Sequence, residues 1–278
     1  MNRRSLALAA AVVLAFGVFA IVTMMTRYSQ LLIPAVVMRG TDPGEAVAPS
    51  FADRVARSVH DRFGGRAEPG RREIALTFDD GPYAVSTPLL LDVLADLHVH
   101  ATFFVIGRDA EQFPTLARRI AADGHEIANH TYTHPDLDRL DAGSVRKELA
   151  AAAQALAPFS HDRGITAFMR PPHGRYRVAT IAAAQSAGYD VILWNDDPGD
   201  WRSVPAAAIE THVFAHATAP EILLLHSGKL STIEMLPSLV ARFSAMHYRF
   251  VTVGELLRDV SPDRIIHPEH IEASAFNG

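Results

Sequence analysis

The sequence has no cysteine among its 278 residues. This absence excludes disulfide bonds, thiolate zinc sites and enzymes that use a cysteine nucleophile. A strong charge of either sign is also missing, since 26 Lys and Arg against 31 Asp and Glu give a formal net charge of −5. Nucleic-acid binding normally calls for a basic face, so the composition gives no reason to expect such a partner. Apolar residues, in contrast, make up 49%, which is enough for a full core.

The first 25 residues form a separate segment. Arg3 and Arg4 precede an uncharged and almost wholly apolar run over residues 6–25. About 20 such residues match a helix that crosses a bilayer core. The positive-inside rule would keep residues 1–5 in the cytoplasm and place the rest of the chain outside. A cleaved signal peptide is the alternative, because Val18-Phe19-Ala20 fits a cleavage site, but the run is longer than a usual signal core, so we expect an uncleaved anchor.

Three further parts follow this segment. Residues 26–70 contain four prolines and several glycines, and we interpret them as a linker with a short helix around Phe51–Phe63. Residues 71–260 carry the regular pattern of a folded domain. Residues 261–278 form a polar tail that gives no further indication.

Within the domain, short apolar runs alternate with segments of helical spacing. Strands are expected at Ile74–Phe78, Ala101–Ile106, His125–Asn129, Phe168–Pro171, Val191–Trp194, Ile222–Leu225 and Arg249–Val253. Helices are expected at Thr87–Leu97, Ala110–Ala122, Ala142–Leu156, Val178–Ala187, Ala206–Ala217 and Ile233–Met246. Several strands are continuously apolar, which indicates an α/β fold with a parallel sheet covered by helices. A barrel and a doubly wound sheet both fit this pattern.

Polar residues recur immediately after the expected strands. They are Asp79, Asp80, His130, His134, Arg170, His173, Asp196, Asp197, Asp200 and His226. In parallel α/β folds the carboxyl ends of the strands converge on one face, and functional sites are built there. Contributions from five separate strand ends therefore predict a functional site.

Two adjacent carboxylates, Asp79 and Asp80, follow the first strand. Because they point in different directions, one can bind a metal while the other handles protons. An ordinary Asp-Gly turn explains this pair equally well when it is taken alone.

His130 and His134 lie four residues apart, so they can meet on one face of a helix or converge from a tight loop. With Asp80 they form a His-His-Asp set, and neutral imidazoles suit zinc and similar divalent metals. Three protein ligands leave an open position for water, as in catalytic zinc sites. Unrelated loop histidines are the alternative.

The remaining polar groups could complete an acid–base set. Arg170 can hold a carboxylate bidentately, and Gly174 allows the backbone to approach a ligand closely. A pair between Asp200 and His226 would raise the histidine pKa and favour a general acid. Trp201 and Trp194 are the only tryptophans, and exposed aromatic rings near polar clusters often stack on sugars, although core packing explains Trp194 equally well.

Together these segments resemble the polysaccharide deacetylase family, carbohydrate esterase family four, over about residues 73–257. Five motifs of that family occur in order. They are Thr77-Phe78-Asp79-Asp80-Gly81-Pro82, His130-Thr131-Tyr132-Thr133-His134, Arg170-Pro171-Pro172-His173-Gly174, Asp197-Pro198-Gly199-Asp200-Trp201 and Leu224-Leu225-His226. Five ordered matches are far more specific than any one of them.

The resemblance implies a distorted (β/α) barrel with seven or eight parallel strands. It also implies a bound divalent metal, Zn²⁺ or another ion such as Co²⁺, and a general base, Asp79, that Arg170 orients. The implied metal ligands are Asp80, His130 and His134.

For the second half of the reaction, the resemblance implies His226 as general acid, tuned by Asp200. Trp201 and Leu224 would line the acetyl pocket, and a backbone N–H near His173 would hold the oxyanion. The family commonly has a tyrosine at the position of His173, so substrate contact by this side chain is expected to differ.

The implied reaction removes N-acetyl groups from an envelope or chitin-like amino-sugar polymer, such as peptidoglycan or chitooligosaccharides. An esterase acting on O-acetyl groups of a polymer such as xylan is an alternative, because the metal site suits both reactions. A glycan-binding protein that kept the fold without catalysis is another, and the complete set of polar residues argues against it. The expected anchor favours an envelope substrate.

Overall fold

The computed structural model describes residues 72–159 and 167–258. The expected anchor at 6–25, the linker at 26–70 with its short helix, and the tail at 261–278 lie outside the described residues. In the part that is described, no helix combines the length and apolar character needed to span a bilayer.

Seven strands of the described chain form one sheet in the order β5-β4-β3-β2-β1-β6, and β7 pairs with β1. Every pair is parallel. The strands are β1 (Glu73–Asp79), β2 (Thr102–Val105), β3 (Glu126–Asn129), β4 (Phe168–Met169), β5 (Asp190–Val191), β6 (Glu221–His226) and β7 (Arg249–Phe250). One edge of β1 pairs with β6, while its other edge pairs with β7 at the start and β2 at the end.

A single bridge links the two ends of this strand order. Beyond β5 the chain reaches Asp196, which forms a parallel bridge with Leu223 of β6. The chain therefore passes from β1 to β5 and then closes against β6, the neighbour of β1. The expected parallel α/β sheet is confirmed, and this link is consistent with the expected distorted barrel.

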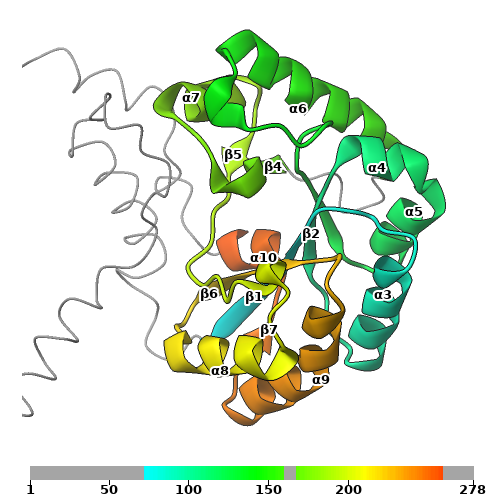
Figure 1. Cartoon of the computed structure of the whole chain (residues 1–278), viewed down its shortest axis with the longest axis vertical. Coiled ribbons are helices and arrows are strands. Elements are labelled where there is room, and N and C mark those ends of the chain that lie inside the picture. Colours follow the sequence, from blue (N-terminus) through cyan, green and yellow to red (C-terminus); the bar gives the residue numbers. More distant parts are fainter. Residues whose placement is uncertain (1–71, 160–166, 259–278) are drawn as a thin grey trace, which may run out of the picture. The chain divides into compact units, whose positions relative to one another are not determined.

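Eight α-helices occur in the described ranges, and α3 to α9 lie around the strands (Figure 1). They are α3 (Ser86–Asp96), α4 (Gly107–Gln112), α5 (Pro114–Ala122), α6 (Ala142–Leu156), α7 (Val178–Ser186), α8 (Ala206–His216), α9 (Leu230–Ala245) and α10 (Val253–Arg258). Short 3₁₀ turns lie at η1 (Leu137–Arg139), η2 (Ala157–Phe159), η3 (Pro172–Gly174) and η4 (Asp200–Arg202). Helix α6 has the expected bounds, because its alanine-rich sequence favours helix and Asp141 caps the backbone N–H of Ser144.

The single helix expected over Ala110–Ala122 is wrong. Two helices, α4 and α5, meet at Phe113, whose φ of −125° and ψ of 61° are not helical. A residue that precedes proline is disfavoured in the helical region. Pro114 instead begins α5, where a missing N–H leaves no hydrogen bond unmade.

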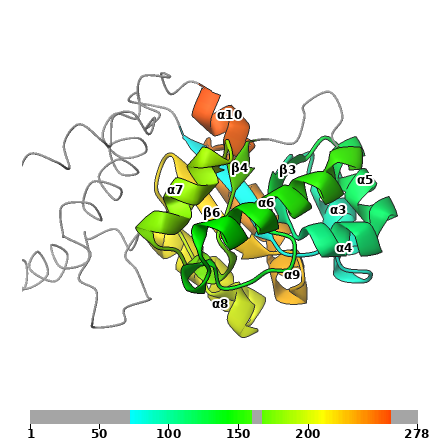
Figure 2. The ribbon, with the colours of Figure 1, turned by 90° about the horizontal axis from the view of Figure 1, so that it is seen from above.

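Side chains of the strands alternate between two apolar layers. Ile74, Leu76 and Phe78 of β1 pack with residues of the surrounding helices. Ala75 packs instead with a second cluster that includes Phe104, Ala128, Ile222, Val253 and Leu256. Helix α10 contributes the last two and lies across one end of the strands (Figures 1 and 2). Because side chains alternate along a strand, Thr77 and Asp79 lie on the same side of β1 as Ala75. Asp79 lies at the carboxyl end of β1, where polar residues cluster.

Candidate active site

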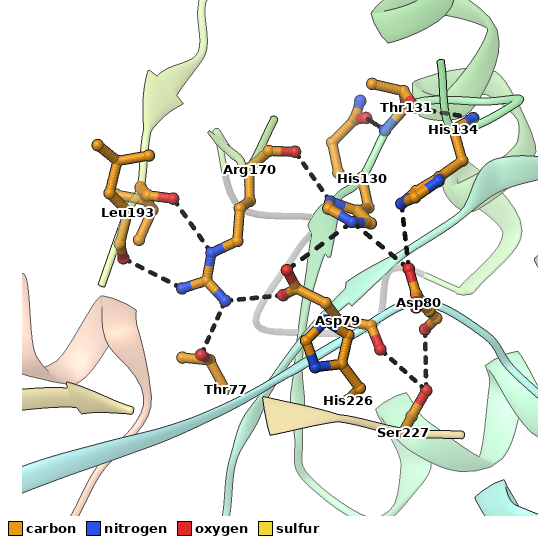
Figure 3. Close-up of polar contacts among 12 residues, drawn as sticks. Thr77, Asp79, Asp80, His130, Thr131, His134, Arg170, Leu193, His226 and Ser227 are labelled. Atoms are coloured by element: carbon orange, nitrogen blue, oxygen red, sulfur yellow. Dashed lines mark hydrogen bonds and ion pairs between the residues drawn. The ribbon is translucent and has the colours of Figure 1, made fainter. Parts of the chain in front are cut away.

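The carboxyl ends of β1, β3, β4 and β6 bring the motif residues together. Asp79 ends β1 in register with His226, which ends β6. His130 directly follows β3, and the backbone N–H of Arg170, which follows β4, donates to the carbonyl of Asn129 at 3.0 Å. Figure 3 shows Arg170 and His130 directed toward Asp79, and His134 directed toward Asp80. The expectation that these strand ends converge is met.

Asp80, His130 and His134 form a cluster whose possible ligand atoms all lie within 4.8 Å of one another. Oδ1 of Asp80 lies 3.2 Å from Nε2 of His134 and 3.6 Å from Nε2 of His130. A tetrahedral ion with bonds of about 2.0–2.1 Å would separate its ligand atoms by about 3.3 Å. Nδ1 of His130 lies 2.8 Å from the carbonyl oxygen of Arg170, which fixes its proton there and leaves Nε2 free as a ligand. The donor set therefore fits a divalent metal.

The electrostatics of the cluster agree with this fit. Burial lowers the pKa of His130 below its ordinary value, although the nearby carboxylates of Asp79 and Asp80 act in the opposite direction. Burial would raise the pKa of Asp80, but the hydrogen bond from His134 and the charges of His130 and His226 bring it well below the usual range. A neutral imidazole and an ionised carboxylate are the forms that bind metals.

His130 and His134 lie on a tight loop and not on a helix. Thr131 and His134 have positive φ values of 67° and 61°, and Asp80 has 72°. The left-handed region is unfavourable for residues other than glycine, and such strain concentrates at functional sites. The loop is therefore held in place by its surroundings.

Arg170 is fully buried and positions Asp79. Its Nη1 donates to Oδ1 of Asp79 at 2.7 Å and to Oγ1 of Thr77 at 2.8 Å. Nε and Nη2 donate to the carbonyls of Ile192 and Leu193. The expected bidentate grip on a carboxylate is thus wrong, because the remaining donors satisfy backbone carbonyls. Oδ2 of Asp79 stays unbound by Arg170 and lies 3.8 Å from Nε2 of His130.

Asp200 and His226 form the expected pair. Oδ1 of Asp200 lies 2.7 Å from Nδ1 of His226, and Oδ2 accepts from the backbone N–H of His226 and from Oγ1 of Thr232. Burial would lower the pKa of His226, but the hydrogen bond and the charge of Asp200, with those of Asp79 and Asp80, raise it above its ordinary value. The arrangement favours the protonated imidazole.

The three residues expected to contact substrate lie in different settings. His173 is exposed, its Nδ1 lies 2.9 Å from Oδ1 of Asp136, and its ring centroid is 4.6 Å from that of His134. Trp201, in η4, is 47% exposed, and the guanidinium carbon of Arg202 lies 4.6 Å from its ring centroid. Leu224 is buried in β6, two residues before His226 and hence on the same side of the strand.

The backbone at Gly174 lies close to the ring of Trp194. A Cβ atom at this position would meet Cη2 of Trp194 at 2.7 Å, and φ is 64°. The close approach is therefore to Trp194, which also lies beside Arg170, with the guanidinium carbon 5.5 Å from its ring centroid. Trp194 is partly buried, packs against the second apolar cluster and supports Arg170 from there.

Three supporting residues were given no role from the sequence. Thr77 accepts from Arg170, Thr232 donates to Asp200, and Oγ of Ser227 donates to the carbonyls of Asp79 and Asp80 at 3.1 Å. Strand alternation could have identified Thr77, two residues before Asp79. Ser227 directly follows His226, so its position after a strand end could also have identified it. Thr232 lies on α9, away from any strand end, so the sequence gives no such signal for it.

A parallel α/β sheet with a His-His-Asp cluster, a buried Asp–Arg pair and an Asp–His pair defines a metal-dependent hydrolase of the α/β class. A family model described as polysaccharide deacetylase matches residues 66–192. A chitooligosaccharide deacetylase from Bradyrhizobium sp. (strain ANU 289) is 41% identical over 159 residues, covering 57% of this chain and 72% of the relative. A peptidoglycan-N-acetylglucosamine deacetylase from Bacillus cereus is 30% identical over 227 residues and covers 80% of each chain. The chain belongs to the polysaccharide deacetylase family.

Solved structures agree with this assignment. A crystal structure of a peptidoglycan N-acetylglucosamine deacetylase is similar with a TM-score of 0.64 and 32% identity, covering 67% of this chain and 88% of the other. A family 4 carbohydrate esterase pseudoenzyme from Bacillus anthracis has the same TM-score at 25% identity, covering 68% and 66%. Since a pseudoenzyme can share the fold, activity depends on the residues of the site.

Proposed function

We propose that the protein is a polysaccharide N-deacetylase that removes N-acetyl groups from an envelope or chitin-like amino-sugar polymer. It is a hydrolase acting on carbon–nitrogen bonds other than peptide bonds. Relatives named as chitooligosaccharide and peptidoglycan deacetylases support this substrate class. One observation carries the proposal: a metal-ligand set, a carboxylate base and a histidine acid lie together at one face of the sheet.

The metal that we propose is Zn²⁺, with Co²⁺ as a substitute, held by Asp80, His130 and His134. When bound, such an ion lowers the pKa of a water molecule and polarises a carbonyl group. Oδ2 of Asp79 can take the proton of the attacking water, because Arg170 holds only Oδ1. His226, protonated through its pairing with Asp200, can give a proton to the departing amine. The products are acetate and the free amino sugar.

Substrate contacts are proposed for Trp201, Leu224 and His173. The ring of Trp201 offers a surface on which a sugar can stack, and Leu224 would contact the acetyl methyl group. The backbone N–H of His173 would stabilise the oxyanion, and its imidazole, beside His134, would face the neighbouring sugar.

We also propose that residues 6–25 anchor the protein in a membrane with the catalytic domain outside the cytoplasm. The support is the length and apolar character of this run and the two arginines before it. Such a location would place the enzyme beside envelope polymers.

The deciding experiment measures acetate release from peptidoglycan, chitooligosaccharides and acetylated xylan, each with and without a chelator. We expect release from an N-acetylated polymer, loss on chelation, and recovery with Zn²⁺ or Co²⁺. Release from xylan alone would instead establish an O-acetyl esterase, and binding without release a glycan-binding protein. Asp79→Asn should lower kcat at least about 100-fold while Zn²⁺ still binds, because Asp79 acts as base and is not a proposed ligand.

A further inference from the structure

The loop between the two histidine ligands depends on side chains outside it. Residues 131–134 follow β3 without forming a helix, and Thr131 and His134 both have positive φ. A β-branched residue in this region is particularly unfavourable. The loop therefore needs external contacts to keep the conformation that directs His134 toward Asp80.

Each backbone N–H from Thr131 to His134 donates to a side-chain oxygen. Thr131 donates to Oδ1 of Asn129 at 2.8 Å, and His134 donates to Oγ1 of Thr131 at 3.1 Å. The two between them, Tyr132 and Thr133, both donate to Oε2 of Glu148, at 3.0 and 2.8 Å. The other oxygen of Glu148 accepts from Oγ1 of Thr133 at 2.8 Å. One carboxylate thus satisfies three donors of the loop.

Glu148 is half-buried and lies in α6, a helix seated closely on the start of α4. A Cβ atom at Gly107 would meet Cα of Ala152 at 2.8 Å, so the two backbones nearly touch one turn beyond Glu148. The backbone N–H groups of Gly107 and Arg108 in turn donate to the carbonyls of Thr131 and Tyr132. The loop is therefore held through its carbonyls by α4 and through its N–H groups by α6.

We propose that Glu148 is a positioning residue of the metal site, which fixes the loop so that His134 presents Nε2 beside Asp80. Hydrogen bonds to an ionised acceptor are stronger than neutral ones, which suits a carboxylate in this position. The inference rests on the proposed metal site. It assigns Glu148 no contact with metal or substrate.

The chain beyond His134 is held independently. Arg175 donates to Asp138 through Nη2 at 2.8 Å and through Nε at 3.1 Å, and His173 pairs with Asp136. Loss of Glu148 should therefore loosen residues 131–134 and leave the chain from Asp136 onward in place. Removing partners that orient metal ligands typically costs about 10–100-fold in metal affinity, and we expect a graded loss of this size.

The test compares Zn²⁺ affinity by competition with a chromophoric chelator in the full chain and in Glu148→Ala and Glu148→Gln. Glu148→Ala should bind Zn²⁺ about 10–100-fold more weakly. Glu148→Gln should bind nearly as tightly as the unaltered protein, since its amide oxygen can accept both N–H groups and its NH₂ can donate to Thr133. The matched control is Glu234→Ala, at an exposed site of α9, and it should change nothing. The Tm of each metal-free variant shows whether it is folded.

Unaltered Zn²⁺ affinity in a folded Glu148→Ala variant would overturn the inference, as would a Glu148→Gln variant as weak as Glu148→Ala. If Glu148→Ala does not fold, Glu148→Asp replaces it in the test. Aspartate keeps the charge, but its side chain is one methylene shorter, so its oxygens lie farther from the backbone N–H groups of the loop. His134→Ala separates the two proposals. If it binds Zn²⁺ like the unaltered protein, the metal site itself is wrong, whereas a loss in His134→Ala without one in Glu148→Ala overturns only the role of Glu148.

Discussion

Arg170 connects more parts of the site than any other side chain described above. Its guanidinium donates to Asp79 and Thr77 of β1 and to the backbone beyond β5, and its central carbon lies 4.0 Å from the ring centroid of Phe104. A buried charge is unfavourable unless it is paired and hydrogen-bonded. Asp79 supplies the pairing charge, so the two side chains stabilise each other as well as the site.

Replacing Arg170 with leucine should therefore destabilise the fold as well as the site. Asp79 would lose its ion-pair partner while it remains buried, which typically costs about 3–5 kcal/mol. Urea unfolding monitored by circular dichroism measures this loss. Arg139→Leu is the control, because Arg139 is 69% exposed and its pair with Asp136 should contribute little. Equal stability of the two variants would contradict the role given to Arg170.

A second residue-scale prediction concerns the pH dependence of turnover. The carboxylate of Asp200 helps to raise the pKa of His226, so His226 keeps its proton to a higher pH than an ordinary histidine. Asp200→Asn removes that charge, and His226 should lose its proton at lower pH. Because the general acid has to be protonated, the alkaline limb of the kcat profile should move to lower pH. An unmoved limb would show that His226 is not the group that titrates there.

At the scale of elements, most of the fold follows from the sequence because apolar periodicity and alanine content are local signals. Helix α6 and strand β1 lie where expected. Helix α10 was not expected, although Thr252 and Glu255 bond each other's backbone N–H groups in a capping box, a signal readable from their spacing. The break between α4 and α5 at Phe113 could also have been predicted, because the residue before a proline disfavours the helical conformation.

The site was predicted in the same uneven way. The proposed metal ligands and acid–base groups lie next to strand ends, so their positions could be inferred from the order of residues along the chain. Thr232 and Glu148 could not be found in this way, because each reaches the site from a helix and only tertiary packing brings it there. The sequence also could not predict that Arg170 makes a single hydrogen bond to Asp79. Backbone carbonyls accept from its other donors, and their positions depend on the fold.

The junction of α8 and β6 gives a prediction about stability. Burial raises the pKa of Glu221 to about 8, assisted by the charge of Asp196 and opposed by a hydrogen bond from the N–H of Thr218. The folded protein keeps this proton where the unfolded chain, with an ordinary value of 4.5, loses it. The stabilisation is therefore complete below about pH 4.5 and lost as the pH rises toward 8.

Glu221→Gln should remove this part of the pH dependence. We expect the variant to have a higher Tm than the unaltered protein at pH 8 and a smaller fall in Tm between pH 5 and pH 8. Differential scanning calorimetry at the two pH values measures both quantities. Glu234→Gln, on the exposed face of α9, is the control. Parallel Tm curves for the unaltered protein and Glu221→Gln would contradict the assignment.

At the scale of the whole molecule, the proposed anchor at residues 6–25 should be separable from the catalytic domain. If the run is an uncleaved anchor, the full chain should sediment with membranes, and a chain lacking residues 1–25 should be soluble with unchanged kcat on a soluble chitooligosaccharide. Ultracentrifugation and the mass of the mature protein test this together. A mass that lacks the segment would establish a cleaved signal peptide instead.

The bridge between Asp196 and Leu223 lies beside the acid pair of the site. Asp200 follows the strand segment on one side of this bridge, and His226 ends the strand on the other side. The metal-ligand set instead follows β1 and β3, and neither strand takes part in the bridge. Local opening at the bridge would lengthen the Asp200–His226 contact and leave the metal ligands in place. If His226 is the general acid, such a protein would still bind metal and polymer but would turn over slowly, because proton delivery to the leaving amine would be impaired.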